Sequence, residues 1–546
     1  MRAGMVSAHL RSPVPLGAAA DTIAIAEKRV GLAPLLWRSA GLLVLLLWVL
    51  GVRYRSFDLG VSDADESLFI LIGQAWLAGH LPYVAIWDVK PPGLFLLFAI
   101  AQEVVGPGIL AARLLTAVAV FAGSLALFRF IRRHFAGDWM APAAAFLYPA
   151  YTIILYGLRS RPEVLMAPLV ILALDLALSE RQGRSGGCGL RVVGCGLLLG
   201  VAVMIKQTAG FEALLAAGLV SLRVPGSRRW VSWQPLAKIA AAGALPSACF
   251  LAYFAHSGAA PALYLTPFIG AASRLNGDGI SFGAGLWRFL PMCKPILPLF
   301  AGGLLLVAER RALFRMPDAA GVRMIALWIA ASAAGAVAMR SMYFPYFMPL
   351  VAPLLVASLL VLRTWAAALA APAAKFTIAF AVVAVVGGYP LAWFAKFEVY
   401  DVGASHLPAD VARAMQAAGL RPNDTIYVVD QETTIYLFAG AALPTRYIQS
   451  DHLVCDFTLP DTEPDAEIRR IMASGPRFVV ISHWRRWMVC ERPDRVAIVD
   501  TYLARDYTLL TTLDDDGQSV DIYRQSRAPE APASTPPASG SKQARP

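Results

Sequence analysis

The chain has 546 residues, of which 58% are hydrophobic and only 16% are charged, and its formal net charge is +11 at pH 7. Soluble domains have about 45–50% apolar and about 25% charged residues, so this composition excludes an ordinary soluble protein and indicates a membrane protein. The positive charge does not indicate nucleic-acid binding, because the basic residues lie between apolar segments and no nucleic-acid motif accompanies them.

The first 34 residues contain basic side chains but no compact apolar core followed by a small-residue cleavage site. Such a segment is not a cleaved signal peptide. We therefore predict a cytoplasmic N-terminal tail over residues 1–34. The first membrane span follows it directly.

Apolar segments long enough to cross a bilayer recur over residues 35–396. A helix rises about 1.5 Å per residue, so about 20 apolar residues cross about 30 Å of hydrocarbon. This measure predicts a membrane all-α fold, a multi-span bundle of about eleven transmembrane helices. The spans lie near residues 35–52, 108–130, 139–157, 162–179, 190–205, 208–222, 236–255, 289–308, 323–339, 344–362 and 375–394.

Basic loops indicate which side of the membrane each loop occupies. Short loops rich in Lys and Arg stay in the cytoplasm. With the spans above, the cytoplasmic loops include "RFIRRHF", "RVPGSRRW" and "ERRALFR", whereas "SDADESLF" lies outside. Residues 91–106 are apolar but short, and counting them as a span would invert every later loop. We therefore predict a helix at the outer membrane surface there, within a first outer loop over residues 53–106.

The last part of the chain has a different pattern. Short alternating segments such as "RFVVIS" and "VDIYRQ" are typical of strands, and "PADVARAMQAAGL" is typical of an amphipathic helix. We predict an extracytoplasmic α/β domain over residues 397–526, followed by a disordered Pro- and Ala-rich tail over residues 527–546. Cys455 and Cys490 fit a disulfide there and equally fit two unrelated thiols.

The first outer loop contains two charged motifs. Asp65 and Glu66 come first, and Lys90 follows, directly before Pro91 and Pro92. Singly, such residues are usually solvated loop charges, or a lysine that snorkels to the membrane surface. Together they favour a site, because the two prolines fix φ and hold the lysine on a rigid backbone.

This combination resembles the polyprenol-phosphate-sugar-dependent glycosyltransferases of the GT-C fold, which include protein O-mannosyltransferases and bacterial lipid A aminoarabinose transferases. The resemblance covers about residues 35–393 in architecture, and its motifs lie within residues 65–92. Family members commonly have Lys-Pro-Pro-Leu and a Tyr soon after the acidic pair, whereas Gly93 and Phe69 stand here. These two departures bear on the identity of the substrate. The resemblance implies a GT-C-like bundle and a polyprenyl-phosphate donor.

Several cations lie at the predicted outer ends of spans, against the positive-inside trend. A cation beside hydrocarbon needs an anionic partner, and a lipid phosphate suits Lys and Arg. The alternative for Lys206 and Arg340 is snorkelling, and for Arg161 it is a pair with Glu163. The resemblance further implies a donor-phosphate role for Arg340 and Tyr343. The predicted phosphate-binding residues are Lys90, Arg161, Lys206, Arg340 and Tyr343.

The resemblance implies an inverting hexosyl or pentosyl transfer to a hydroxyl acceptor, and the charged residues suit the roles that this reaction needs. Asp65 is the candidate base, because an ordinary Asp is ionised at neutral pH. Glu66 assists it or orients the acceptor. Cations stabilise the departing phosphate, and no nucleotide-binding glycine loop is present. Asp63, Asp65 and Asp88 offer oxygens that suit a divalent metal, but the resemblance implies no metal, and we predict no cofactor.

The partners we predict are a polyprenyl-phosphate-linked sugar donor, membrane lipids and an acceptor of unknown identity, but no nucleic acid. The predicted location is the inner membrane, with the site and the C-terminal domain on the periplasmic side. A transporter or flippase of lipid-linked sugars is the main alternative, and a non-catalytic envelope assembly protein is another. The absence of an internal repeat, and the gathering of polar residues at one face, disfavour the transporter.

Overall fold

The structure is a computed structural model of the whole chain. It describes residues 32–60, 62–136, 139–183, 189–222, 231–270, 281–292, 294–368, 388–389, 392, 406–429, 433–449, 451–455, 459, 461–482, 492–515 and 518–526. The chain divides into two compact units, residues 1–48 and residues 49–546. Residues 1–31 of the predicted N-terminal tail, most of the predicted span at 375–394, Cys490 and the tail after residue 526 lie outside the described residues, and a helix begins at Leu32, before the predicted end of that tail at residue 34.

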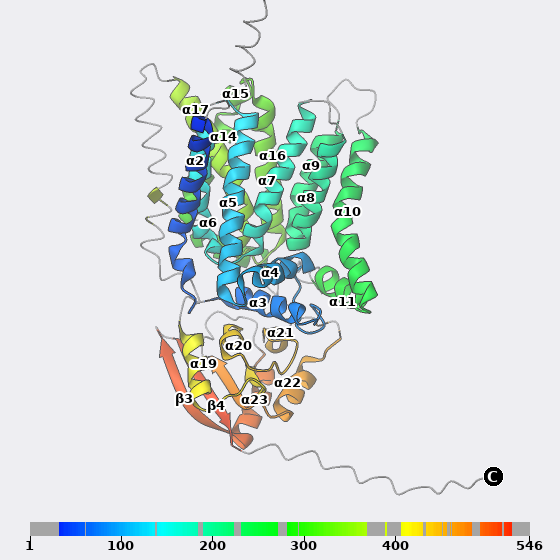
Figure 1. Cartoon of the computed structure of the whole chain (residues 1–546), viewed down its shortest axis with the longest axis vertical. Coiled ribbons are helices and arrows are strands. Elements are labelled where there is room, and N and C mark those ends of the chain that lie inside the picture. The colour runs from blue at the N-terminus through cyan, green and yellow to red at the C-terminus, as the bar shows by residue number, and fades with distance from the viewer. Residues whose placement is uncertain are drawn as a thin grey trace, which may run out of the picture. The chain divides into compact units, whose positions relative to one another are not determined.

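Long apolar helices dominate the chain up to residue 368. They coincide with the apolar segments of the sequence, because a helix satisfies every backbone polar group within hydrocarbon. Figure 1 shows helices α5 to α10, α14, α16 and α17 side by side. The bounds are α2 Leu32–Val52, α5 Ile109–His134, α6 Met140–Thr152, α7 Pro162–Arg181, α8 Leu190–Ile205, α9 Gly210–Ser221, α10 Trp233–His256, α14 Leu297–Ala308, α16 Ala319–Ala338 and α17 Val351–Ala368.

Six helices among the described residues are long and apolar enough to cross a membrane, and four shorter apolar helices accompany them. The chain is therefore a membrane protein, and the count of about eleven spans stays a prediction. The predicted span at 289–308 is divided between α13 (Phe282–Met292) and α14, with a short 3-10 helix over Lys294–Ile296 between them. Pro295 and Pro298 lack the backbone N–H that a continuous helix needs.

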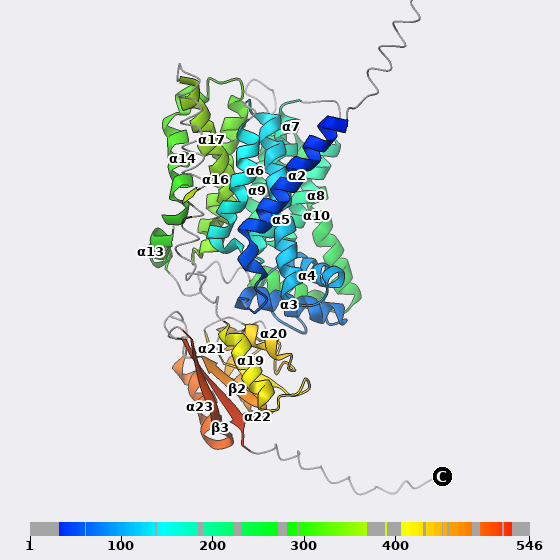
Figure 2. The same ribbon diagram turned by 60° about the vertical axis from the view of Figure 1, so that its left-hand side comes forward.

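Two shorter helices cross one end of this bundle. They are α3 (Ala64–Leu77) and α4 (Pro92–Val105), and Figures 1 and 2 both show them lying crosswise there. Asp63 caps α3 by accepting a hydrogen bond from the Glu66 amide, and Pro92 occupies the first turn of α4. We call this the α3–α4 end of the bundle.

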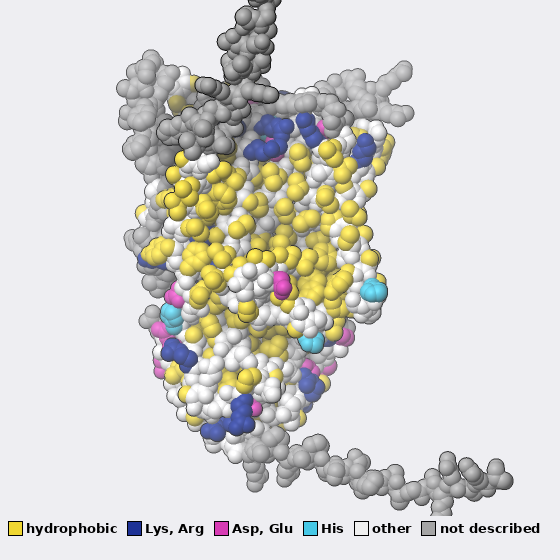
Figure 3. Space-filling model, in the orientation of Figure 1, with side chains coloured by type: hydrophobic (Ala, Val, Ile, Leu, Met, Phe, Trp, Pro, Cys, Tyr) yellow, Lys and Arg dark blue, Asp and Glu magenta, His cyan; other side chains and the backbone are white. Residues whose placement is uncertain are grey.

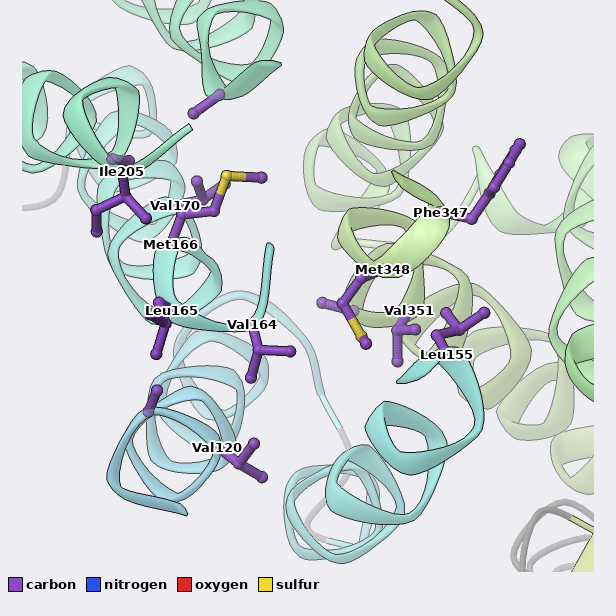
Figure 4. Close-up of a cluster of buried hydrophobic side chains, with 14 of the residues drawn as sticks. Val120, Leu155, Val164, Leu165, Met166, Val170, Ile205, Phe347, Met348 and Val351 are labelled. Carbon is purple, nitrogen blue, oxygen red and sulfur yellow. The ribbon is translucent and has the colours of Figure 1, made fainter. Parts of the chain in front are cut away.

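Helix α6 ends in an irregular turn over Ile153–Gly157, where Tyr156 has a φ of 60°. The turn exposes carbonyl groups that a regular helix would use internally. The turn is part of an apolar core built from segments far apart in the sequence. Figure 4 shows its side chains: Val120 of α5, Leu155 of the turn, Val164, Leu165, Met166 and Val170 of α7, Ile205 of α8, Phe347 and Met348 before α17, and Val351.

The C-terminal α/β region, residues 406–526, contains a four-stranded sheet in the order β1-β2-β4-β3. β1 pairs with β2 in parallel, and the other pairs are antiparallel. The strands are β1 Ile426–Val428, β2 Phe478–Ser482, β3 Tyr507–Asp515 and β4 Gln518–Gln525, and the helices are α19 Leu407–Ala417, α20 Thr434–Ala439, α21 Asp451–Val454, α22 Pro464–Ala473 and α23 Pro493–Asp506. Helix α20 packs against α3, and Cys455 is disulfide-bonded.

Figure 3 shows hydrophobic side chains covering the surface of the helices. Lys and Arg side chains gather at the end far from α3 and α4. Helix α5 ends on this side of the bundle (Figure 1), and its last turn contains Arg132, Arg133 and His134. The bundle therefore presents an apolar band bordered by a basic end, as a membrane protein requires.

Candidate functional site

The stretch "SDADESLF" forms the start of α3, where its carboxylates have three different environments. Asp63 is the cap, and Asp65 and Glu66 fall in the first helical turn. Negative groups are favourable there, because the helix dipole and the free backbone N–H groups stabilise them. The cap thus fixes the directions in which Asp65 and Glu66 point.

Glu66 is completely buried. Its carboxylate pairs with Arg113 at 2.7 Å and accepts hydrogen bonds from the Ser62 hydroxyl at 3.0 Å and the Ser160 amide at 2.9 Å. A buried charge is tolerated only when it is paired and hydrogen-bonded, as this one is. Glu66 therefore fixes α3 to α5 and to the turn after α6.

Asp65 is the more accessible carboxylate, with 32% of its side chain exposed. One oxygen contacts Arg161 at 2.5 Å, and the other lies 3.4 Å from the Lys90 ammonium. Arg161 also pairs with Asp63 at 3.0 Å. Burial lowers the pKa of Arg161, but Asp63 and Asp65 outweigh this effect and raise it, so Arg161 stays charged.

Lys90 lies between two carboxylates. Its ammonium is 3.4 Å from Asp65 and 3.3 Å from the buried Asp88, and it sits 4.9 Å from the centre of the Phe69 ring. These ion pairs are longer than the 2.5 Å contact of Arg161, so Lys90 is held less tightly by its carboxylates. The Tyr83 hydroxyl donates to the Lys90 carbonyl at 2.8 Å and holds the backbone before the two prolines.

Two buried arginines support the turn that leads to Arg161. Arg53 donates to the carbonyls of Gly157 and Leu158, and Arg113 donates to Leu158 at 3.1 Å. Burial and the neighbouring Arg113 lower the pKa of Arg53 to about 9. The end of the irregular turn and Leu158 directly after it thus supply the carbonyl oxygens that bind both guanidinium groups.

Lys206 comes directly after α8, and its ammonium pairs with Glu163 in the first turn of α7. It also lies 4.2 Å from the centre of the Tyr346 ring, which packs edge-on against Tyr343. Burial lowers the pKa of Lys206, Glu163 counteracts this, and Lys90 lowers the pKa further. Lys206 and Lys90 are therefore close enough to affect each other's charge.

The structure brings Asp65, Glu66, Lys90, Arg161 and Lys206 of the predicted site into one charged network. Tyr343 packs edge-on against Tyr346, whose ring lies beside the Lys206 ammonium of this network. Arg340 is exposed, and among the contacts of the described residues no hydrogen bond or ion pair joins its side chain to the network. The predicted phosphate role of Arg340 thus stays a prediction.

Three residues of the network were missed in the sequence. Arg113 lies inside a predicted span, and an ionisable residue within a span is by itself a signal of a site. Arg53 follows the first span, and its partners were hidden because they are backbone carbonyls. Glu163 appeared only as a partner for Arg161, whose pKa it helps to raise, and it also pairs with Lys206.

Among the described residues, the network includes the carboxylates Asp63, Asp65, Glu66, Asp88 and Glu163 and the cations Arg53, Lys90, Arg113, Arg161 and Lys206. Within the described ranges, no group of three or more His, Cys, Asp or Glu side chains is placed to hold a metal ion. The arrangement offers an accessible carboxylate beside cations, which suits proton removal next to an anionic group.

The helical bundle with α3 and α4 across one end, together with the C-terminal α/β region, has the GT-C fold of membrane glycosyltransferases. ArnT from Cupriavidus metallidurans bound to undecaprenyl phosphate matches with a TM-score of 0.60 at 18% identity, over 88% of this chain and 97% of that chain. An oligosaccharyltransferase from Archaeoglobus fulgidus matches with a TM-score of 0.51 at 13% identity, over 81% of this chain and 68% of that chain.

The sequence itself matches the family described as dolichyl-phosphate-mannose-protein mannosyltransferase over residues 89–253. This segment begins just before Lys90 and includes Arg161, Glu163 and Lys206. No curated protein matches the sequence.

Proposed function

We propose that this protein is an inverting membrane glycosyltransferase. It transfers a hexosyl or pentosyl group from a polyprenyl-phosphate donor to a hydroxyl of a lipid, glycan or protein. The observation that carries the proposal is the accessible carboxylate of Asp65, 3.4 Å from Lys90 and 2.5 Å from Arg161, in a bundle of the GT-C fold. The match of residues 89–253 to a mannosyltransferase family supports it.

Asp65 acts as the base. The acceptor hydroxyl gives its proton to the Asp65 carboxylate while its oxygen forms a bond to the anomeric carbon. The bond from that carbon to the phosphate oxygen breaks, and polyprenyl phosphate leaves with the electron pair. A positioned base of this kind contributes about 10²–10⁴-fold. The exposed part of the Asp65 side chain leaves room for the acceptor.

Cations bind the donor phosphate and the charge that develops on it. Lys90 is the main candidate, since its ion pairs at 3.3 and 3.4 Å are loose enough for a phosphate to compete with Asp65 and Asp88. Lys206 supplies a second ammonium beside it. Arg161, which the sequence predicts to bind the donor phosphate, pairs with Asp65 in this proposal and orients it. Arg340 and Tyr343, in the segment before α17, help to bind the donor phosphate.

Glu66 and Glu163 act as positioning residues. Glu66 is buried against Arg113, so the acceptor does not reach it in this arrangement. Glu163 pairs with Lys206 and sets the place of its ammonium. The pair Asp65–Glu66 is thus divided into a reacting carboxylate and a supporting one.

The site lies on the outer side of the cytoplasmic membrane in this proposal. The Lys and Arg side chains at the end far from α3 and α4 support it, since basic ends stay in the cytoplasm. The C-terminal α/β region then lies on the same outer side as the site, within reach of an acceptor in the periplasm.

The test replaces Asp65 by Asn and, separately, Lys90 by Ala in the full chain, and measures glycan transfer in membranes. The matched controls are Asp500→Asn on α23 and Lys238→Ala on α10, which are both exposed. We expect transfer to fall by about 10²-fold or more in each site variant and to remain unchanged in the controls. Near wild-type transfer in both site variants contradicts the proposal. Sugar-lipid movement across the membrane that is unchanged in Asp65→Asn indicates a transporter instead.

The sugar and the acceptor are identified by a separate measurement. Mass spectrometry of surface glycans from a strain that lacks the protein is compared with the parent strain. We expect the loss of one sugar substituent, and its mass distinguishes a hexose from a pentose. An unchanged set of glycans together with a defect in envelope assembly indicates the non-catalytic role.

A further inference from the structure

The four residues Trp87, Asp88, Val89 and Lys90 alternate between two environments. Asp88 and Lys90 belong to the charged network. Trp87 and Val89 belong instead to the hydrophobic core of the C-terminal α/β region, where they are 2% and 6% exposed. The same short segment thus carries the candidate phosphate-binding lysine on one side and a buried anchor on the other.

The anchor makes specific contacts with the C-terminal α/β region. The Trp87 amide donates to the Arg446 carbonyl at 2.9 Å. Its ring packs against Tyr447, with 5.6 Å between ring centres, and against the buried His452 at 4.6 Å. The Tyr447 hydroxyl is itself hydrogen-bonded to Thr462 at 2.8 Å. Trp87 therefore inserts among side chains that are fixed by their own partners.

A second connection joins the same region to the acidic motif. The Ser67 hydroxyl of α3 donates to Thr434 of α20 at 3.1 Å and lies 3.0 Å from the Ser62 hydroxyl, which in turn donates to Glu66 at 3.0 Å. Both halves of the site, the start of α3 and the lysine segment, are thus attached to the C-terminal α/β region.

We propose that Trp87 is a positioning residue for the transfer reaction. Its insertion into the C-terminal α/β region fixes the backbone that carries Lys90, three residues later. The C-terminal α/β region then forms part of the frame of the site, in addition to any contact it makes with the acceptor. This inference rests on the proposed function for its kinetic consequence, but its structural consequence is independent of it.

The experiment uses the full chain in lipid nanodiscs with Trp87→Ala, Trp87→Phe and, as a matched control, Trp233→Ala at an exposed tryptophan of α10. Hydrogen exchange is measured for the amides of residues 84–92 and of strands β1 and β2. We expect Trp87→Ala to raise exchange in residues 84–92 by about 10-fold or more while the strands are unchanged. We expect Trp87→Phe to restore most of the protection, because it keeps an aromatic ring in the same place.

Kinetics provide the second readout. We expect Trp87→Ala to lower kcat by about 10–100-fold with a smaller change in KM, because a displaced Lys90 stabilises the transition state less well. Val89→Ala, a smaller deletion in the same segment, should change exchange and kcat in the same direction to a smaller extent. If the Trp87→Ala variant does not fold well enough to be purified, Val89→Ala is used in its place.

Three outcomes separate the inference from the proposed function. Unchanged exchange in residues 84–92 and unchanged kcat in Trp87→Ala overturn the inference. An equal rise of exchange in the loop and in strands β1 and β2 also overturns it, because Trp87 is then only a core residue. A wild-type chain that transfers no sugar contradicts the proposed function, and the exchange measurement then decides whether Trp87 positions the segment.

Discussion

At the scale of single residues, two adjacent carboxylates differ because of what surrounds them. Asp65 keeps part of its side chain exposed and contacts two cations, whereas Glu66 is buried against Arg113, Ser62 and Ser160. A reacting carboxylate must be reached by its substrate, and a buried paired one holds elements together. Substitutions of Asp65 and of Glu66 are therefore expected to differ in their effects on stability and on activity.

We predict that Glu66→Gln destabilises the protein while Asp65→Asn does not. Glu66→Gln leaves the buried Arg113 without its counter-charge, which costs about 3–5 kcal/mol. Asp65→Asn should change stability by less than about 1 kcal/mol, because its ion pairs are partly exposed. Thermal unfolding of both variants in the same detergent measures this difference, and equal losses of stability would contradict the roles we assign.

Lys206 gives a prediction about pH. Burial lowers the pKa of its ammonium, so the charge is lost at a lower pH than in an ordinary lysine, whose pKa is about 10.4. We therefore expect kcat/KM for the donor to decline at alkaline pH, with an apparent pKa lower than that of an ordinary lysine. Between this lowered pKa and the pKa of an ordinary lysine, the unfolded chain binds more protons than the folded chain, so stability should rise with pH over that range.

Lys206→Arg provides the comparison, because a guanidinium keeps its charge in this range. We expect its alkaline decline in kcat/KM to move to higher pH, and Lys238→Arg on α10 should leave the profile unchanged. Identical alkaline profiles for Lys206→Arg and the wild type would show that Lys206 does not bind the donor.

At the scale of elements, Gly93 accounts for one departure of the sequence from its resemblance. A Cβ at this position would lie 2.6 Å from the Met204 carbonyl oxygen, which is part of the backbone of α8. Glycine therefore lets α4 approach the end of α8. This approach places Lys90, just before α4, near Lys206, just after α8.

We predict that Gly93→Leu separates the two lysines and lowers kcat/KM for the donor by about 10-fold or more. Gly210→Ala is the matched control, because a Cβ there has no neighbour within 4 Å. Donor titrations of the purified variants measure the effect. An unchanged kcat/KM in Gly93→Leu would mean that the approach of α4 to α8 is not needed for the site.

Much of the fold could be predicted because hydrophobic segments determine where membrane helices lie. That Asp65 and Lys90 lie close together could also be predicted, since charge beside hydrocarbon stands out in a sequence. Their roles in catalysis remain predictions. The role of the irregular turn could not be predicted, because the carbonyls of Gly157 and of Leu158 directly after it bind Arg53 and Arg113, and backbone contacts leave no signal in the sequence. The insertion of Trp87 into the C-terminal α/β region depends on contacts between segments more than 350 residues apart, which no local pattern records.

At the scale of the whole molecule, the direction of the chain in the membrane decides where the chemistry takes place. The α3–α4 end carries the charged network, and the opposite end carries the basic residues in the last turns of α5 and α7. A donor on the outer leaflet reaches the network only if the α3–α4 end faces outward.

We predict that His80→Cys, exposed after α3, reacts with a membrane-impermeant thiol reagent added outside intact cells. Arg132→Cys, exposed at the end of α5, should react only after the membrane is opened. The parent chain, which has its own cysteines, gives the background for both. The reverse pattern would place Asp65 and Lys90 in the cytoplasm and contradict the proposed function.

The most direct test of the account is the single-turnover rate of Asp65→Asn, purified in nanodiscs with its lipid-linked sugar donor and acceptor, compared with the wild type and Asp500→Asn. Undecaprenyl phosphate binding is measured on the same samples. We predict that transfer falls by about 10²–10⁴-fold while binding of the lipid phosphate is kept or strengthened, because a negative charge beside Lys90 is gone. Transfer at the wild-type rate in Asp65→Asn would contradict the role of this carboxylate as the base.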